Sequence, residues 1–257
     1  MRRSWLVPGM LLAMSGSSTA LDEAKLVDLT YAFSEETIYW PTENPFHLDV
    51  LAQGPSGHGY FYAANKFCAP EHGGTHIDAP RHFSEPGLTV DAVPLGAGIG
   101  PAAVVDVRAQ AARDRDYRVS VDDLLGWEKM HGRLPEGAIV LMRSGWGKYW
   151  PDKQRYLGTA TFGDTKNLHF PGFSQQAAEW LVRERRIDAI GVDTASIDYG
   201  PSADFIVHQI ILGANKPALE NVANLDRLPE SGATIIALPM KIAGGTGAPA
   251  RIIALLP

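Results

Sequence analysis

Short apolar runs separated by turn-forming residues recur along most of the chain. They lie at residues 26–30, 46–52, 60–68, 102–107, 138–143, 188–193, 234–238 and 251–256. Apolar runs of about four to eight residues that are bounded by glycine, proline or other turn residues are typical of strands. The pattern therefore predicts that strands make up most of the core.

Two segments show the pattern of amphipathic helices instead. We expect a helix to begin after Ser120, which suits an N-cap, and to end near Met130. A second helix is expected to begin after Ser174, because the apolar residues that follow form one stripe: Ala177, Ala178, Leu181 and Val182. Few helices and many strands predict an α/β fold in which the helices pack against a strand-rich core.

Composition adds a prediction at the N-terminus. Arg2 and Arg3, the short apolar stretch after them and the small residues before position 21 are typical of a signal peptide over residues 1–20. The apolar stretch is too short for a stable membrane anchor, so we expect an exported, periplasmic or secreted protein. Residues 21–257 contain no repeat or Pro/Ser linker and are expected to form a single domain.

Charge and cysteine content narrow the class of protein. The formal net charge is −6, with 45% hydrophobic and 20% charged residues, which is typical of an ordinary globular protein and predicts no nucleic-acid partner. Cys68 is the only cysteine, so the chain can form no internal disulfide, and we expect its side chain to be buried.

Two enzyme classes are disfavoured by their motifs. The segment 245–250, Gly-Thr-Gly-Ala-Pro-Ala, matches the dinucleotide-binding pattern Gly-x-Gly-x-x-Ala in its letters. Pro249 stands where that motif needs a helix, and no βαβ unit follows, so a dinucleotide site is not expected. The chain has no Gly-x-Ser-x-Gly, which disfavours a serine hydrolase.

Metal-ligand side chains are concentrated between His72 and His82, in the order His-x3-His-x-Asp-x3-His. The two glycines at 73–74 and Pro80 disfavour a helix. In an extended chain the even positions share one side, so His72, His76 and Asp78 would face a common point. We therefore expect a strand or a nearly extended loop that presents all three side chains together.

Two imidazoles and a carboxylate suit Zn²⁺ or Mn²⁺ and leave coordination positions open for water. An open position is typical of a catalytic metal site, because the cation makes a bound water more acidic. His82 follows an expected turn at Pro80, so it is predicted to lie beside the metal. An unperturbed imidazole has a pKa of about 6.5, which suits it to transfer protons.

The same segment resembles the hallmark of the cyclase-type metal-dependent hydrolases, His-x-Gly-Thr-His-x-Asp-x-Pro-x-His-Phe, at every fixed position. This family includes bacterial kynurenine formamidases, isatin hydrolases and a dienelactone hydrolase. Further similar segments follow in the expected order, at 27–30, 141–146, 191–198 and 247–251. The resemblance implies a swivelling β/β/α-type single domain and a homodimer or higher homo-oligomer.

The resemblance also implies roles for individual residues. The metal-binding positions of the hallmark correspond to His72, His76 and Asp78. Its last histidine, which corresponds to His82, would act as acid and base. A second ion, where present, would be held by Asp78 with a distant histidine and glutamate, which correspond to His208 and Glu220. Whether one or two ions bind is left open.

Aromatic residues suggest the substrate class. The segment Tyr39-Trp40-Pro41 differs from the Tyr-Pro-Gly of the formamidases and is more similar to the isatin hydrolases. We expect aromatic side chains to contact a flat substrate: Trp40, Tyr60, Phe61 and Phe83. The predicted function is metal-dependent hydrolysis of a cyclic or aryl amide, with isatin to isatinate as the leading case. An arylformamidase acting on N-formylkynurenine, a lactone hydrolase and a non-catalytic exported metal- or ligand-binding protein are the alternatives.

Overall fold

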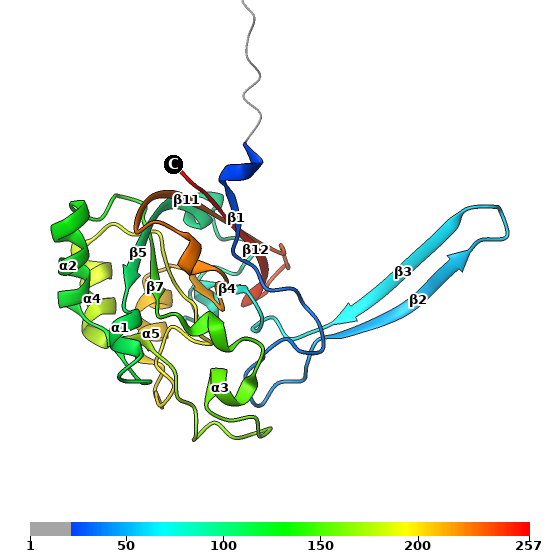
Figure 1. The fold of residues 1–257 in the computed structure, drawn as a ribbon, viewed down its shortest axis with the longest axis horizontal. Coiled ribbons are helices and arrows are strands. Elements are labelled where there is room, and N and C mark those ends of the chain that lie inside the picture. Colours follow the sequence, from blue (N-terminus) through cyan, green and yellow to red (C-terminus); the bar gives the residue numbers. More distant parts are fainter. Residues whose placement is uncertain (1–21) are drawn as a thin grey trace, which may run out of the picture.

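A closed sheet forms the centre of the protein, which is described from a computed structural model over residues 22–257. Its strand order is β1-β12-β11-β5-β7-β9-β10-β4, and β12 also pairs with β4, so the sheet closes into a barrel (Figure 1). The strands are β1 (Leu26–Asp28), β4 (His76–Asp78), β5 (Ile99–Asp106), β7 (Ile139–Arg143), β9 (Ala189–Val192), β10 (Ala218–Glu220), β11 (Ser231–Pro239) and β12 (Gly247–Leu255). The expected signal peptide lies outside the described residues.

Alternating side chains divide the apolar residues between two cores. In β7, Ile139 and Leu141 face the barrel interior, where they pack with Ile77 of β4. Val140 and Met142 face the other side and pack against the helices. Because successive strand residues point to opposite faces, the neighbours of Ile77 in β4 lie on the helix-facing side of the sheet.

The helices are α1 (Arg108–Ala111), α2 (Val121–His131), α3 (Lys153–Leu157), α4 (Gln175–Glu184) and α5 (Ile206–Gly213). Four of them, α1, α2, α4 and α5, lie together on one side of the barrel, and α3 lies apart from them (Figure 1). Ser120 caps α2 with a capping box that includes Asp123, and Ser174 caps α4. None of the helices within residues 22–257 has the length and apolar character needed to cross a lipid bilayer.

A two-stranded hairpin extends away from the barrel (Figure 1). It consists of β2 (His47–Pro55) and β3 (Phe61–Cys68), and most of its side chains are exposed. Cys68 at its base is exposed as well, so the prediction that this side chain is buried was wrong. The cause is that, among residues 22–257, β3 pairs only with β2 and its side chains are left largely uncovered.

The elements agree with the hydrophobic pattern. Each of the eight predicted strand segments overlaps a strand, and α2 and α4 begin directly after the predicted N-caps. The α/β single-domain fold is thereby confirmed. A second small sheet pairs β6 (Arg118–Val119) with β8 (Gly172–Phe173), and short 3-10 turns lie at Glu23–Lys25, Pro80–His82, Leu95–Gly98, Trp146–Tyr149 and Leu225–Arg227.

Candidate metal centre

Strand pairing between β4 and β10 places the first ligands. Glu220 stands directly opposite His76 in the antiparallel register, and Ala218 stands opposite Asp78. Residues that face each other in such a pair share one face of the sheet. His76 and Asp78 therefore lie beside Glu220, with His76 Nε2 3.2 Å from Asp78 Oδ1 and 3.5 Å from Glu220 Oε2.

His72 reaches the same point from a turn. β4 begins only at His76, and Gly74 has a left-handed φ of 56° that turns the chain before it. The expectation of one extended stretch was therefore right for His76 and Asp78 and wrong for His72. The Nδ1 atom of His72 lies 2.6 Å from Asp78 Oδ1, and the His72 ring keeps some exposure to solvent.

His208 enters from the opposite side, on helix α5. Its Nε2 atom lies 3.3 Å from Asp78 Oδ2 and 3.2 Å from Glu220 Oε1. Asp198 accepts hydrogen bonds from the backbone amides of Val207 and His208, and from Nδ1 of the His208 ring at 2.7 Å. The buried imidazole thus has the polar partner that its apolar surroundings require.

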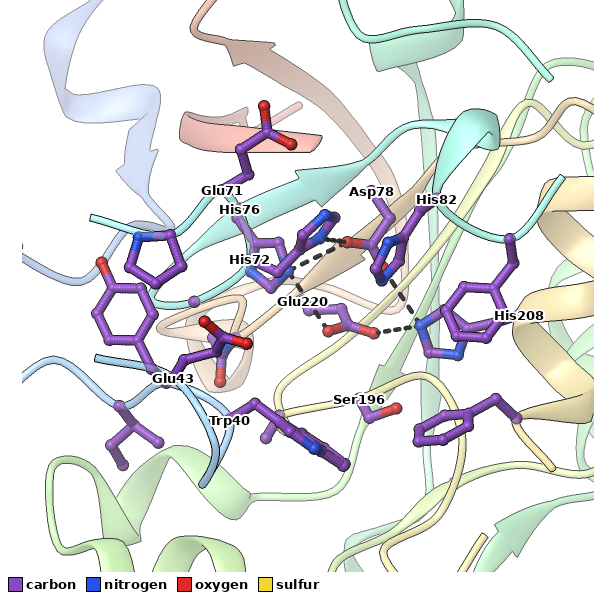
Figure 2. A pocket seen from close by; sticks show the side chains of 18 residues that line it. Trp40, Glu43, Glu71, His72, His76, Asp78, His82, Ser196, His208 and Glu220 are labelled. Carbon is purple, nitrogen blue, oxygen red and sulfur yellow. Dashed lines mark hydrogen bonds and ion pairs between the residues drawn. The ribbon is translucent and has the colours of Figure 1, made fainter. Parts of the chain in front are cut away.

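His82 lies on the short turn Pro80–His82 and stacks on His72, with ring centroids 3.7 Å apart. Burial lowers the pKa of His82 to about 4, so the ring is neutral at physiological pH. Figure 2 shows the four histidines around the carboxylates: His72, His76, His82 and His208 with Asp78 and Glu220.

In His76 and His208, the hydrogen bond made by Nδ1 determines which role is left for Nε2. His76 Nδ1 donates to the Gly74 carbonyl at 2.9 Å, and His208 Nδ1 donates to Asp198. In a neutral ring the Nε2 atom then carries a lone pair, which in both residues faces Asp78 and Glu220. Lone pairs of nitrogen and oxygen that converge in this way need a cation between them or additional protons.

The electrostatics agree with this need. Burial alone would lower the pKa of His76, but Asp78 and Glu220 raise it to about 9. Burial, together with Asp78, raises the pKa of Glu220. Within residues 22–257, the buried His76 Nε2 and Asp78 Oδ2 have no hydrogen-bond partner of good geometry. A divalent cation would satisfy these atoms and replace the extra protons, so this donor set fits a metal ion.

In the described part of the chain, residues 22–257, two groups of side chains have ligand atoms close enough to hold an ion together. One group is His76, Asp78 and Glu220; the other is His72, Asp78 and His82. Asp78 belongs to both groups and is almost fully buried. The geometry is therefore compatible with a carboxylate shared between two ions as well as with a single ion.

A cavity of about 430 Å³ opens above these side chains. Its walls include the aromatic side chains of Trp40 and Phe83, which the sequence predicted. Phe205 completes the wall, with its ring centroid 5.8 Å from that of Trp40 and 5.6 Å from that of Phe83. Glu43 and Ser196 add polar atoms to the lining (Figure 2).

The structure does not bring Tyr60 and Phe61 to this cavity. They lie at the far end of the hairpin and are 57% and 67% exposed. Their expected contact with substrate is therefore not made within one chain. Sequence reasoning missed Phe205. Its position in the chain was a usable signal, because Phe205 lies between Asp198, in a segment similar to the family, and the helix that carries His208.

The barrel, the hallmark segment and its convergent side chains define the class of protein. The chain belongs to the family described as putative cyclase, whose profile matches residues 27–199. This confirms the resemblance seen in the sequence.

Individual members of the family are similar over most of their length. The chain is 35% identical to the isatin hydrolase of Roseibium aggregatum over 208 residues, 77% of each protein. It is 26% identical to the kynurenine formamidase of Salinibacter ruber over 228 residues, 89% of this chain and 96% of that protein. The solved structure of isatin hydrolase A from Ralstonia solanacearum has a TM-score of 0.82 at 36% identity, covering 90% of this chain and 92% of that one.

Proposed function

We propose that this protein is a metal-dependent hydrolase of cyclic or aryl amides and that isatin is its substrate. The observation that carries the proposal is the clustering of His72, His76 and His208 around two buried carboxylates, Asp78 and Glu220, at a cavity with aromatic side chains in its wall. The similarity to isatin hydrolases over most of the chain supports the same substrate class. Hydrolysis would add water to the amide carbonyl and break the bond between that carbon and nitrogen, giving isatinate.

The residues proposed to hold the ion are His72, His76, Asp78, His208 and Glu220. Imidazole and carboxylate donors suit Zn²⁺ or Mn²⁺. When bound there, the cation would supply a more acidic water and would polarise the amide carbonyl. Asp78 would bind one ion or be shared between two. The metal analysis described below measures how many ions are bound per chain.

The chain's own groups would move the proton and orient the substrate. His82 is neutral and lies against His72, so it can accept a proton from the attacking water and donate one to the departing nitrogen. The rings of Trp40, Phe83 and Phe205 pack against one another and would form a wall for a flat bicyclic substrate, with its carbonyl toward the carboxylate cluster. The aromatic wall also excludes water from the reacting bond.

The proposal is tested on the purified mature protein. Bound metal is measured first, and the loss of isatin absorbance is then followed with and without a chelator. We expect activity that is lost on chelation and restored by Zn²⁺ or Mn²⁺. Turnover by a protein shown to be free of metal would contradict the mechanism.

A second candidate is an arylformamidase or lactone hydrolase with the same centre. The similarity to kynurenine formamidases favours this alternative. A panel of isatin, N-formylkynurenine and a dienelactone separates the substrates by their kcat/KM values. If none of the three is hydrolysed while metal is bound, a non-catalytic binding protein becomes the better description.

We further propose a homodimer that is exported to the periplasm or secreted. One face of the hairpin carries Leu48, Val50, Phe61 and Phe67, each about half exposed or more. The opposite face carries the Asp49–Lys66 ion pair. An isolated hairpin of two strands is only marginally stable in water, so a second copy that covers the apolar face would stabilise it. Export rests on the N-terminal sequence alone and is tested by cell fractionation.

A further inference from the structure

The segment Gly245-Thr246-Gly247, which resembles a dinucleotide motif only in its letters, lies directly against the metal-centre loop. Thr246 Oγ is 2.9 Å from His72 Nε2 and 2.7 Å from Glu71 Oε2. The same Glu71 oxygen accepts a hydrogen bond from the Thr246 backbone amide at 2.9 Å. Thr246 therefore links a carboxylate to the outer nitrogen of His72.

The backbone of this segment is fixed on the hallmark loop as well. The Ala79 amide donates to the Thr246 carbonyl at 2.9 Å, directly after the ligand Asp78. The Val90 amide donates to the Gly245 carbonyl, also at 2.9 Å. The position of Thr246 relative to His72 is thus set by main-chain hydrogen bonds on both sides.

The two glycines provide the space that this contact needs. A Cβ atom on Gly247 would lie 2.5 Å from His72 Cε1, and one on Gly245 would lie 2.7 Å from Glu71 Oε1. A larger residue at position 247 would keep the His72 ring away from Thr246, and a larger residue at position 245 would keep the Glu71 carboxylate away. The spacing of glycine, threonine and glycine is therefore explained by the shape of Glu71 and His72.

The direction of the hydrogen bonds fixes the state of the His72 ring. Glu71, as a carboxylate, can only accept, so the single hydroxyl proton of Thr246 is donated to it. Thr246 Oγ must then accept from His72, which places the ring proton on Nε2. In a neutral ring Nδ1 then carries the lone pair. It faces Asp78 Oδ1 at 2.6 Å, a contact that needs a cation or a second ring proton between the two atoms.

We propose that Thr246 and Glu71 are positioning residues that make His72 bind the metal ion through Nδ1, whereas His76 and His208 bind through Nε2. This inference rests on the metal-binding role proposed for His72. A hydrogen bond to the outer nitrogen fixes the tautomer and the orientation of a ligating histidine and makes it a stronger donor. Because His82 stacks on His72, the same link also holds the proton-transferring ring in place.

The first test compares variants that differ in one group. Thr246→Val removes the hydroxyl and keeps the branched shape, whereas Thr246→Ser keeps the hydroxyl. Zn²⁺ affinity is measured by competition with a chromogenic chelator, and folding is checked by the melting temperature. We expect Thr246→Val to bind Zn²⁺ about 10- to 100-fold more weakly and Thr246→Ser to bind within about threefold of wild type. Thr165→Val, on an exposed loop, is the matched control.

Equal Zn²⁺ affinity of Thr246→Val and wild type would overturn the proposal. A second measurement needs no substitution at Thr246 and applies even if that variant does not fold. Long-range ¹H–¹⁵N spectra of the zinc-loaded wild type show which nitrogen of each histidine carries the proton, and the His72 signals are assigned by their loss in His72→Gln. We expect a proton on His72 Nε2 and a metal shift on Nδ1; the reverse pattern excludes the proposal.

These readouts separate this inference from the proposed function. A protein that binds Zn²⁺ through His72 Nδ1 but leaves isatin intact would contradict only the substrate assignment. A wild-type protein that binds no Zn²⁺ or Mn²⁺ would remove both. Isatin hydrolysis that is unaffected in Thr246→Val, with unchanged Zn²⁺ affinity, would keep the function and reject the positioning role.

Discussion

Nε2 of His208 lies 3.3 Å from Oδ2 of Asp78, although the two residues come from a helix and a strand far apart in the sequence. The barrel makes this contact possible. The chain that leaves α5 continues into β10, and β10 pairs with β4, the strand that carries Asp78. The candidate metal centre is therefore assembled by the fold and is not a property of the hallmark segment alone.

Replacing His208 tests that assembly. We expect His208→Ala to weaken Zn²⁺ binding at least about 100-fold, because losing a ligand should cost more than losing a residue that only orients one. Zn²⁺ competition titration measures the effect. His169→Ala is the control, since His169 is half exposed and bonds Asp116 away from the cavity. If both variants bind Zn²⁺ equally well, His208 is not a ligand.

Removing the metal should destabilise the folded protein. Asp78 and Glu220 are both buried, and the pKa of Glu220 is raised by burial and by Asp78, so the pair repels when both are ionised. At a free-metal concentration about 100 times the Kd, metal binding adds about 2.7 kcal/mol to the free energy of unfolding. For a domain of this size we expect chelation to lower the melting temperature by roughly 5–10 °C. An unchanged melting temperature in protein verified to be metal-free would contradict this role.

His82 can be separated from the ligands by measuring two quantities together. We expect His82→Ala to retain its metal and to lose turnover of isatin by about 10²- to 10⁴-fold, the usual contribution of a general acid or base. Metal content and kcat are determined on the same preparation, with His58→Ala on the hairpin as the control. Loss of metal along with activity would make His82 a ligand instead, since it lies within reach of an ion bound by His72 and Asp78.

The sequence predicted the elements that depend on local pattern. The strands follow from apolar runs, and α2 and α4 follow from serine caps and apolar stripes. The positions of His76 and Asp78 follow from strand alternation. Their partner Glu220 was identified only by family resemblance, because its place opposite His76 is a consequence of strand register, which no local pattern encodes.

Other features depend on contacts that a linear pattern cannot show. The turn that carries His72 is set by the left-handed backbone of Gly74. The sequence alone does not show whether a glycine at this position is left-handed or extended. Tyr60 and Phe61 belong to a run of consecutive aromatic residues at the start of β3. The run predicts a strand but does not say whether any layer covers it. Thr246 lies in a segment with no expected role, and only the closed barrel brings it to His72.

The hairpin provides a test of the dimer. Val50 and Phe61 lie on its apolar face, where added charge would oppose burial by a second copy. We expect the double variant Val50→Asp, Phe61→Asp to be monomeric by size-exclusion chromatography with light scattering at a concentration where wild type is dimeric. Ala64→Asp adds charge on the opposite face and should remain dimeric. A monomeric wild type would contradict the proposed dimer.

Stability at acid pH should depend on the pair of Glu128 and Arg185, which joins the end of α2 to the end of α4. Arg185 donates to Glu128 through Nε at 2.7 Å and through the terminal nitrogen at 2.8 Å, and both side chains are nearly buried. These bonds lower the pKa of Glu128 below its ordinary value of 4.5. A carboxyl group whose pKa is lowered by folding stabilises the protein above its unfolded-state pKa, and this contribution is lost as the pH falls through the folded-state pKa.

We therefore expect Glu128→Gln to be less stable than wild type at neutral pH, by about 2 kcal/mol. That corresponds to a melting temperature roughly 4–8 °C lower. The difference should shrink as the pH falls below 4.5, because wild-type Glu128 then loses its charge as well. Glu136→Gln is the matched control: its partner Arg186 directly follows Arg185 in the chain, but both side chains are more than 70% exposed, so the pair should contribute little at any pH. Melting curves recorded from pH 7 to pH 3 measure this difference. If the difference in melting temperature between wild type and Glu128→Gln stays constant over this range, the ion pair is not the cause of the difference.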